Sequence, residues 1–315
     1  MTNKPVPQPI ILDTDMLTDC DDAGTMALMH TLADRGEVDI LGVVLNGYDT
    51  HGFHSAVISA INTHYGRPSI PIGVSKRLIP SKKSSFSEQI WHEFLHDGLT
   101  DQDRPNAVSV YRELLVQADD QTVSIVSIGF LTNLEDLLRS SADAVDDRDG
   151  CALIQDKVRE LVVMGGEYPL GKEHNFCYGG SAPATVYVIE HWPETVPIVF
   201  SGGEIGKQIR TGTGYQNQPN SPMRRAYQLA YDALQVGRPR WDQTALLYAA
   251  RGAVFDGIVY WTLQDQGRNQ IHKDGSNTWL AEGGANHAYL VEAMNPNMLA
   301  EVIEQLIIQS PINRN

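Results

Sequence analysis

Short apolar runs alternate with longer amphipathic segments from residue 9 to residue 202, and this alternation restricts the fold more than any other feature. The apolar runs are rich in valine and isoleucine, as buried strands are, and cover residues 9–15, 38–46, 123–129, 160–166 and 195–202. The segments between them are helix-like, at residues 21–33, 54–65, 107–118, 131–140 and 182–191. Repeated strand–helix–strand units predict an α/β fold with a mostly parallel open sheet, a Rossmann-type core with helices on both faces.

The length of the chain suits one large α/β domain. Its 315 residues contain no internal repeat and no low-complexity tract, so we expect a single domain over residues 1–315. Two polar segments, residues 77–87 and 212–222, are expected to be surface loops, and neither has the character of a domain linker.

The charge balance argues against nucleic acid as a partner. Acidic residues number 39 against 24 basic ones, which gives a net charge of -15. Such a surface repels phosphate backbones, and a neutral small molecule suits it better as a substrate.

Cysteine usage and the chain's first residues favour a cytoplasmic protein. The three cysteines are few and unpaired in spacing, which argues against a disulfide framework and a zinc ribbon. The opening sequence MTNKPVPQPI lacks the apolar run of a signal peptide. No apolar stretch is long enough to span a bilayer, so we expect no membrane association.

Acidic and amide side chains follow the predicted strands, where open parallel sheets bind their ligands. Asp13 and Asp15 end the first strand, Asn46 follows the second, and residues 164–167 follow the fourth. These positions hold no histidine and no serine nucleophile.

Residues 13–22, which we call the acidic turn, contain five aspartates in ten positions. Carboxylates this close repel one another, and a hard divalent cation with oxygen ligands removes the conflict. Calcium or magnesium fits best. Simple helix capping is the alternative for a single aspartate, but five directly after a strand favour a metal or catalytic site. An EF-hand fails, because Gly24 stands where its bidentate glutamate belongs.

Two other functions agree with an aspartate-rich strand end. A magnesium-dependent phosphatase of the haloacid dehalogenase type also opens with strand-Asp-x-Asp. That family continues with Gly-Thr-Leu, whereas Met16-Leu17-Thr18 follow here. The sequence also has no lysine or arginine at the end of a predicted strand that could bind a phosphate. A non-catalytic nucleoside- or ribose-binding protein is the other alternative, and it would be expected to lack the base or a metal ligand.

Five segments, taken in order, resemble the inosine-uridine-preferring nucleoside hydrolase family. The family opens with a strand, Asp-x-Asp, a short turn and Asp-Asp at a helix start, and here the turn is two residues longer. The later segments are VVLNG with Asn46, SIGFLTN, LVVMGGEY followed by Glu173-His174-Asn175, and WDQTALLYA from Trp241. The resemblance runs from Pro9 to about Arg251.

The resemblance implies a calcium-dependent enzyme that hydrolyses the N-glycosidic bond of ribonucleosides to ribose and free base, and a homodimer or homotetramer. It implies that Asp15 is the general base toward a water. It also implies two sets of binding residues. The calcium ligands would be Asp15, Asp22, the Ile128 carbonyl and Asp242. The substrate-binding residues would be Asp21, Asn46, Met164, Glu173, Asn175 and Trp241.

Trp241 departs from the pattern of the family. Inosine-uridine-preferring members have at this position a histidine that is a candidate to protonate the leaving base. An indole is no acid at neutral pH, but it can stack on a purine and so aid departure of the base, which favours purine nucleosides. The remaining candidates for the cavity lining are Asp19, Cys20, His51, His54, His174, Glu204 and His287.

Overall fold

An eight-stranded sheet organises the protein. The structure, a computed structural model, describes residues 6–47, 52–77, 83–284, 286–309 and 311. The strand order is β12-β15-β7-β5-β4-β1-β2-β3, and every neighbouring pair is parallel except β12 and β15. The strands are β1 (Gln8–Thr14), β2 (Val38–Leu45), β3 (Ile72–Val74), β4 (Val123–Ser127), β5 (Val158–Met164), β7 (Ile198–Ser201), β12 (Trp261–Gln264) and β15 (His287–Glu292).

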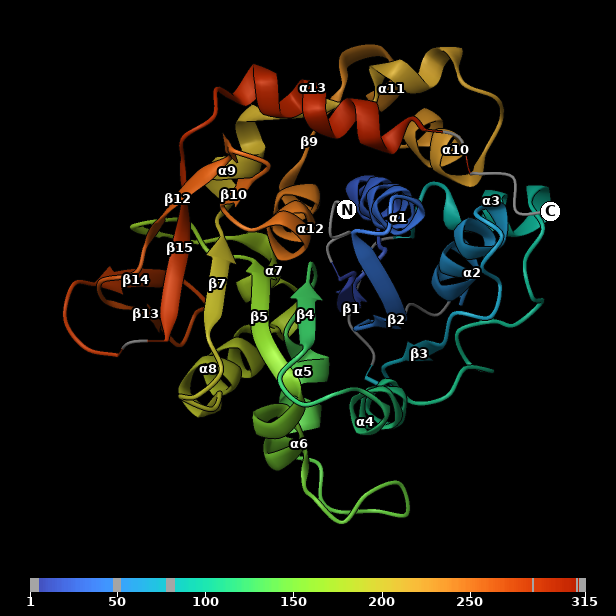
Figure 1. Ribbon diagram of the computed structural model, residues 1–315. Coiled ribbons are helices and arrows are strands. Elements are labelled where there is room, and N and C mark those ends of the chain that lie inside the picture. The colour runs from blue at the N-terminus through green and yellow to red at the C-terminus, as the bar shows by residue number, and fades with distance from the viewer. Residues whose placement is uncertain (1–5, 48–51, 78–82, 285, 310, 312–315) are drawn as a thin grey trace, which may run out of the picture.

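Helices cover both faces of this sheet (Figure 1). Alternate strand residues face opposite sides, so Ile10 and Leu12 join one hydrophobic core and Ile11 joins the other. The first core is covered by α1 (Asp21–Asp34), α2 (His54–His64), α3 (Ser87–Glu93), α10 (Pro222–Leu229), α12 (Trp241–Arg251) and α13 (Pro296–Ile307). The second is covered by α4 (Ala107–Gln117), α5 (Thr132–Leu138), α6 (Gly150–Lys157) and α8 (Ala182–His191).

Shorter elements complete the described chain. The short helices are α7 (His174–Cys177), α9 (Gly203–Gln208), α11 (Ala233–Val236), η1 (Tyr178–Gly180) and η2 (Thr213–Asn217). The remaining strands are β6 (Leu170–Gly171), β8 (Arg210–Thr211), β9 (Arg238–Pro239), β10 (Val254–Phe255), β11 (Ile258–Val259), β13 (Arg268–Ile271) and β14 (Asn277–Leu280). They pair as β13-β14-β6, β10-β11 and β8-β9.

The predicted α/β fold is confirmed. All five predicted strands and all five predicted helices are present, with small shifts at their ends. The segment 212–222, expected to be a loop, contains the one-turn helix η2, while residues 78–82 of the other expected loop lie outside the described residues. In the part of the chain that the structure describes, no helix has the length and apolar character to cross a membrane.

Candidate metal centre and active-site cavity

A cavity of about 360 Å³ opens beside the acidic turn. Its walls come from that turn, the segments that follow β4 and β5, and the stretch from Tyr231 to Asp242. The lining residues are Asp15, Leu17, Thr18, Asp19, Asp21, Asp22, Ile128, Met164, Glu173, His174, Asn175, Tyr178, Tyr231, Arg238, Trp241 and Asp242. Residues more than two hundred positions apart therefore share one cavity.

Backbone geometry in the acidic turn directs its carboxylates. Met16 has a φ of 43°, a left-handed conformation that side chains other than glycine rarely adopt. Its N–H donates to Asp22 Oδ1 at 3.2 Å, and the Thr14 hydroxyl donates to the same oxygen. The Leu17 N–H donates to Asp15 Oδ1 at 3.3 Å. The turn thus holds Asp15, which precedes α1, and Asp22, which lies in the first turn of α1.

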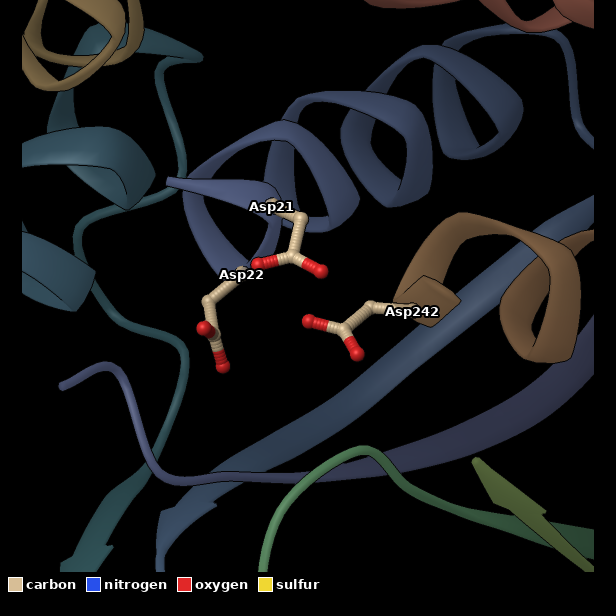
Figure 2. Close-up of side chains that lie close together, drawn as sticks. All are labelled: Asp21, Asp22 and Asp242. Carbon is tan, nitrogen blue, oxygen red and sulfur yellow. The ribbon is translucent and has the colours of Figure 1, made fainter. Parts of the chain in front are cut away.

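Three carboxylates from two helices meet at one point. Asp21 and Asp22 lie in the first turn of α1, and Asp242 lies in the first turn of α12, which packs against α1. One oxygen of each lies within 4.8 Å of the others, and Figure 2 shows the three side chains close together at the starts of the two helices. An all-oxygen donor set of this kind fits a hard divalent cation.

Burial makes these carboxylates unstable as bare anions. It raises the pKa of Asp21, Asp22 and Asp242 well above the usual range, and repulsion between neighbouring carboxylates adds to the effect. Burial, with Coulomb repulsion from Asp21, also raises the pKa of Asp15 to about 8. A bound cation would favour the charged forms, so the electrostatics agree with the donor set.

Two arginines lie near the cluster, and both are held by other groups. Arg240 is fully buried, donates to the Thr211 hydroxyl and carbonyl, and lies 4.4 Å from the centre of the Tyr227 ring. Arg238 forms an ion pair with Asp19. Among the described residues, no salt bridge neutralises the three clustered carboxylates.

Glu173 and Asn175 form a polar wall of the cavity. The Glu173 carboxylate caps α7 by accepting the Asn175 N–H at 2.9 Å, and burial raises its pKa to about 7. The Asn175 side-chain amide donates to the carbonyls of Ile128 at 3.2 Å and Met164 at 3.1 Å. These bonds leave Asn175 Oδ1 without a partner in the described chain, so it can accept a hydrogen bond from a ligand.

Aromatic rings line other parts of the cavity. The Trp241 indole N–H donates to the Gly203 carbonyl at 3.0 Å, which fixes the plane of its ring. The His174 and Tyr178 rings stack with their centres 4.3 Å apart. Flat apolar surfaces beside carboxylates suit a ligand that has both a planar ring and hydroxyl groups.

The structure brings together nine of the ten predicted site residues. The exception is Asn46, which is fully buried outside the lining. Its side-chain Nδ2 donates to Asp13 Oδ1 at 2.8 Å and its side-chain Oδ1 accepts the Phe130 N–H at 3.2 Å, so it links the ends of β1 and β2 with the segment after β4. The oxygen cluster also differs from the predicted ligand set, because it contains Asp21 in place of Asp15.

The seven additional candidates for the cavity lining fall into three groups. Asp19 and His174 line the cavity. Four others do not line it, namely Cys20, His54, Glu204 and His287. His51 lies outside the described residues.

Sequence reasoning missed Tyr178, Tyr231 and Arg238 as lining residues. Arg238 lies on the two-residue strand β9 and does not follow a strand of the main sheet, where the sequence predicts ligand-binding residues. The only available signal was the pair Arg238 and Arg240 just before Trp241, in a chain that is otherwise acidic.

Comparisons with known proteins bear on the family and the fold. A family model described as inosine-uridine preferring nucleoside hydrolase matches residues 10–292. No match is found among curated proteins.

Solved structures share the fold at low sequence identity. The effector protein XOO4466 has a TM-score of 0.71 at 14% identity, with 98% of this chain and 95% of that chain covered. The type III effector protein XopQ, complexed with adenosine diphosphate ribose, has a TM-score of 0.69 at 14% identity, with 98% and 96% covered. An inosine-uridine preferring nucleoside hydrolase from Bacillus anthracis has a TM-score of 0.67 at 16% identity, with 95% and 99% covered.

Proposed function

We propose a function from one premise: the chain belongs to the inosine-uridine preferring nucleoside hydrolase family, whose model matches residues 10–292. The proposal is that the protein hydrolyses the N-glycosidic bond of ribonucleosides to ribose and free base, depends on calcium, and prefers purine nucleosides. The observation that carries it is the meeting of Asp21 and Asp22 with Asp242 in a cavity that also contains a fixed indole.

Calcium would be held by Asp22 and Asp242, together with Asp15 and the Ile128 carbonyl. Asp21 belongs to the same oxygen cluster and would take sugar hydroxyls. When bound, the ion lowers the pKa of a coordinated water and orients that water and the sugar. The position of Ile128 supports its assignment as a calcium ligand. Ile128 lines the cavity, and its carbonyl accepts a hydrogen bond from the side-chain amide of Asn175, another lining residue.

The remaining roles follow from the charge that develops in the reaction. Cleavage passes through a sugar cation that resembles an oxocarbenium ion. The buried carboxylates of Asp21 and Glu173 stabilise that cation because their field is already in place, and with Asn175 they bind the ribose hydroxyls. Asp15 accepts the proton of the attacking water. Trp241 stacks on the base, which gives the preference for purines.

A non-catalytic nucleoside-binding protein is the second candidate. One structural relative is an effector protein complexed with adenosine diphosphate ribose, a ligand that contains a nucleoside. Retention of Asp15, Asp22 and Asp242 favours the enzyme, because a binding protein has no need of a general base.

The test is release of reducing sugar from inosine, adenosine, guanosine, uridine and cytidine. We expect ribose from the purine nucleosides at the highest rates, loss of activity with chelator, and recovery when calcium is added. No release from any nucleoside, with nucleoside binding intact by calorimetry, would favour the binding protein.

A further inference from the structure

We propose that Arg238 binds the base and stabilises the negative charge that the base gains as it leaves. This inference rests on the proposed hydrolysis and adds a residue that the family resemblance did not assign. It also names the preferred base class, which is the 6-oxopurines.

The cavity is strongly acidic, and Arg238 is its exception. Of the lining residues that the structure describes, Arg238 is the one lysine or arginine. Carboxylates favour the positive charge on the sugar but oppose negative charge on the departing base. A permanent cation at the base end corrects this imbalance.

The position of Arg238 identifies the base end. Its Cζ lies 4.3 Å from the centre of the Tyr231 ring and 5.3 Å from that of Trp241. The sugar-binding wall, in contrast, is formed by Glu173 and Asn175. A base stacked on Trp241 therefore borders the guanidinium group.

Asp19 holds the guanidinium and leaves part of it free. Arg238 Nε donates to Asp19 Oδ2 at 2.9 Å, and Nη2 donates to the same oxygen. Asp19 is itself anchored, because its Oδ1 accepts the Cys20 N–H at 2.7 Å. Nη1 makes no hydrogen bond to the described residues, so its two N–H groups are available to a ligand.

This arrangement predicts selection among bases. A guanidinium donates to O6 and N7 of a 6-oxopurine, whereas adenine presents an amino donor at position 6. In the reaction, the bond between the anomeric carbon and the base nitrogen breaks, and its electron pair stays on the base. The water oxygen bonds to the carbon, its proton passes to Asp15, and the base later takes a proton from solvent. Arg238 transfers no proton.

His174 is the competing source of help, because it also lines the cavity and could donate a proton. Burial lowers its pKa below the usual histidine value, which leaves little imidazolium at neutral pH. The two residues make different predictions, since a proton donor gives a pH-dependent effect and a fixed cation does not.

The experiment compares kcat/KM for inosine and for p-nitrophenyl riboside in wild type, Arg238→Gln and His174→Gln. Nitrophenolate is a weak base, because its nitro group delocalises the negative charge, so it needs no help to leave. We expect Arg238→Gln to lose about 10²-fold on inosine and to stay within about threefold of wild type on the nitrophenyl riboside. The ratio of inosine to adenosine activity should fall as well. Arg225→Gln is the matched control, because Arg225 pairs with Glu93 and has a similarly exposed side chain, at 22% against 25% for Arg238.

Equal losses on both substrates, or no loss, would overturn the role of Arg238 while the hydrolase function stands. A selective, pH-dependent loss on inosine in His174→Gln alone would overturn it too. If Arg238→Gln does not fold, Arg238→Lys keeps the charge without the planar fork, and the same two-substrate comparison decides. A wild type that cleaves neither substrate would instead reject the proposed function itself.

Discussion

At the scale of single residues, Asp15 and Asp21 are both buried beside other carboxylates, but we propose different roles for them: Asp15 as the general base and Asp21 as a ligand of the sugar hydroxyls. Asp21 belongs to the tightest group of carboxylate oxygens, with Asp22 and Asp242. Asp15 accepts a hydrogen bond from the Leu17 N–H, and Coulomb repulsion from Asp21 helps to raise its pKa. Of these two residues, we expect only Asp15, which accepts the proton of the attacking water, to be indispensable to turnover.

We therefore expect Asp15→Asn to lower kcat for inosine by at least about 10²-fold, or about 3 kcal/mol in the barrier, because an amide cannot accept the proton. Asp21→Asn should act mainly on KM, since it weakens binding of the sugar hydroxyls. Steady-state kinetics at saturating calcium separates the two. Asp120→Asn is the control for loss of one acidic charge, as its side chain is 77% exposed. Turnover by Asp15→Asn within a few-fold of wild type would refute its role as base.

At the scale of elements, α1 and α12 pack against each other, and large side chains of neighbouring helices approach α1 at Gly24. A methyl group added at Gly24 would overlap the Tyr227 hydroxyl and lie 2.5 Å from the Gln243 side-chain amide. Gln243 follows Asp242 on α12, and its amide donates to the Asp21 carbonyl at 2.7 Å. Gly24 therefore leaves room against α1 for the side chain of Gln243, on the helix that supplies Asp242, and for that of Tyr227 on α10.

Gly24→Ala should force α12 away from α1 and so weaken calcium binding as well as stability. Overpacking of this kind costs about 1–3 kcal/mol. Ala33→Gly, at the far end of α1, should lower the free energy of unfolding by about 1 kcal/mol, and so lower the melting temperature, yet keep calcium affinity. Calcium titration of both variants checks this. Unchanged affinity in Gly24→Ala would show that the helix spacing does not control the site.

The sequence was most informative where a signal is contiguous. The central strands are runs of valine and isoleucine, and the acidic turn packs its aspartates into ten positions, so both could be predicted. The strands β3, β12 and β15 were not predicted. β3 and β12 are short strands at the two edges of the sheet, and β15 is an inner strand in which Val291 is the only valine or isoleucine. The pair of Arg238 with Asp19 joins residues 219 positions apart, and no local pattern indicates it.

At the scale of the whole molecule, the fold concentrates negative charge in one place. The chain carries a net charge of -15, and burial of four carboxylates in one cavity adds an electrostatic cost to folding. The pKa of Asp15 rises from 3.8 to about 8 on folding without metal, so the protonated form is favoured. The metal-free protein should lose stability as pH rises from about 4 to about 8, and calcium should restore it.

The most direct test of the central claim is the thermal unfolding of wild type and Asp242→Asn, with calcium and with chelator, from pH 5 to pH 8. For wild type we predict a calcium-induced stabilisation of about 2.7 kcal/mol at a hundredfold excess over Kd, growing with pH. For Asp242→Asn we predict little or none, because a ligand from α12 is lost. An equal calcium shift in both proteins would contradict the account, since calcium would then bind without Asp242.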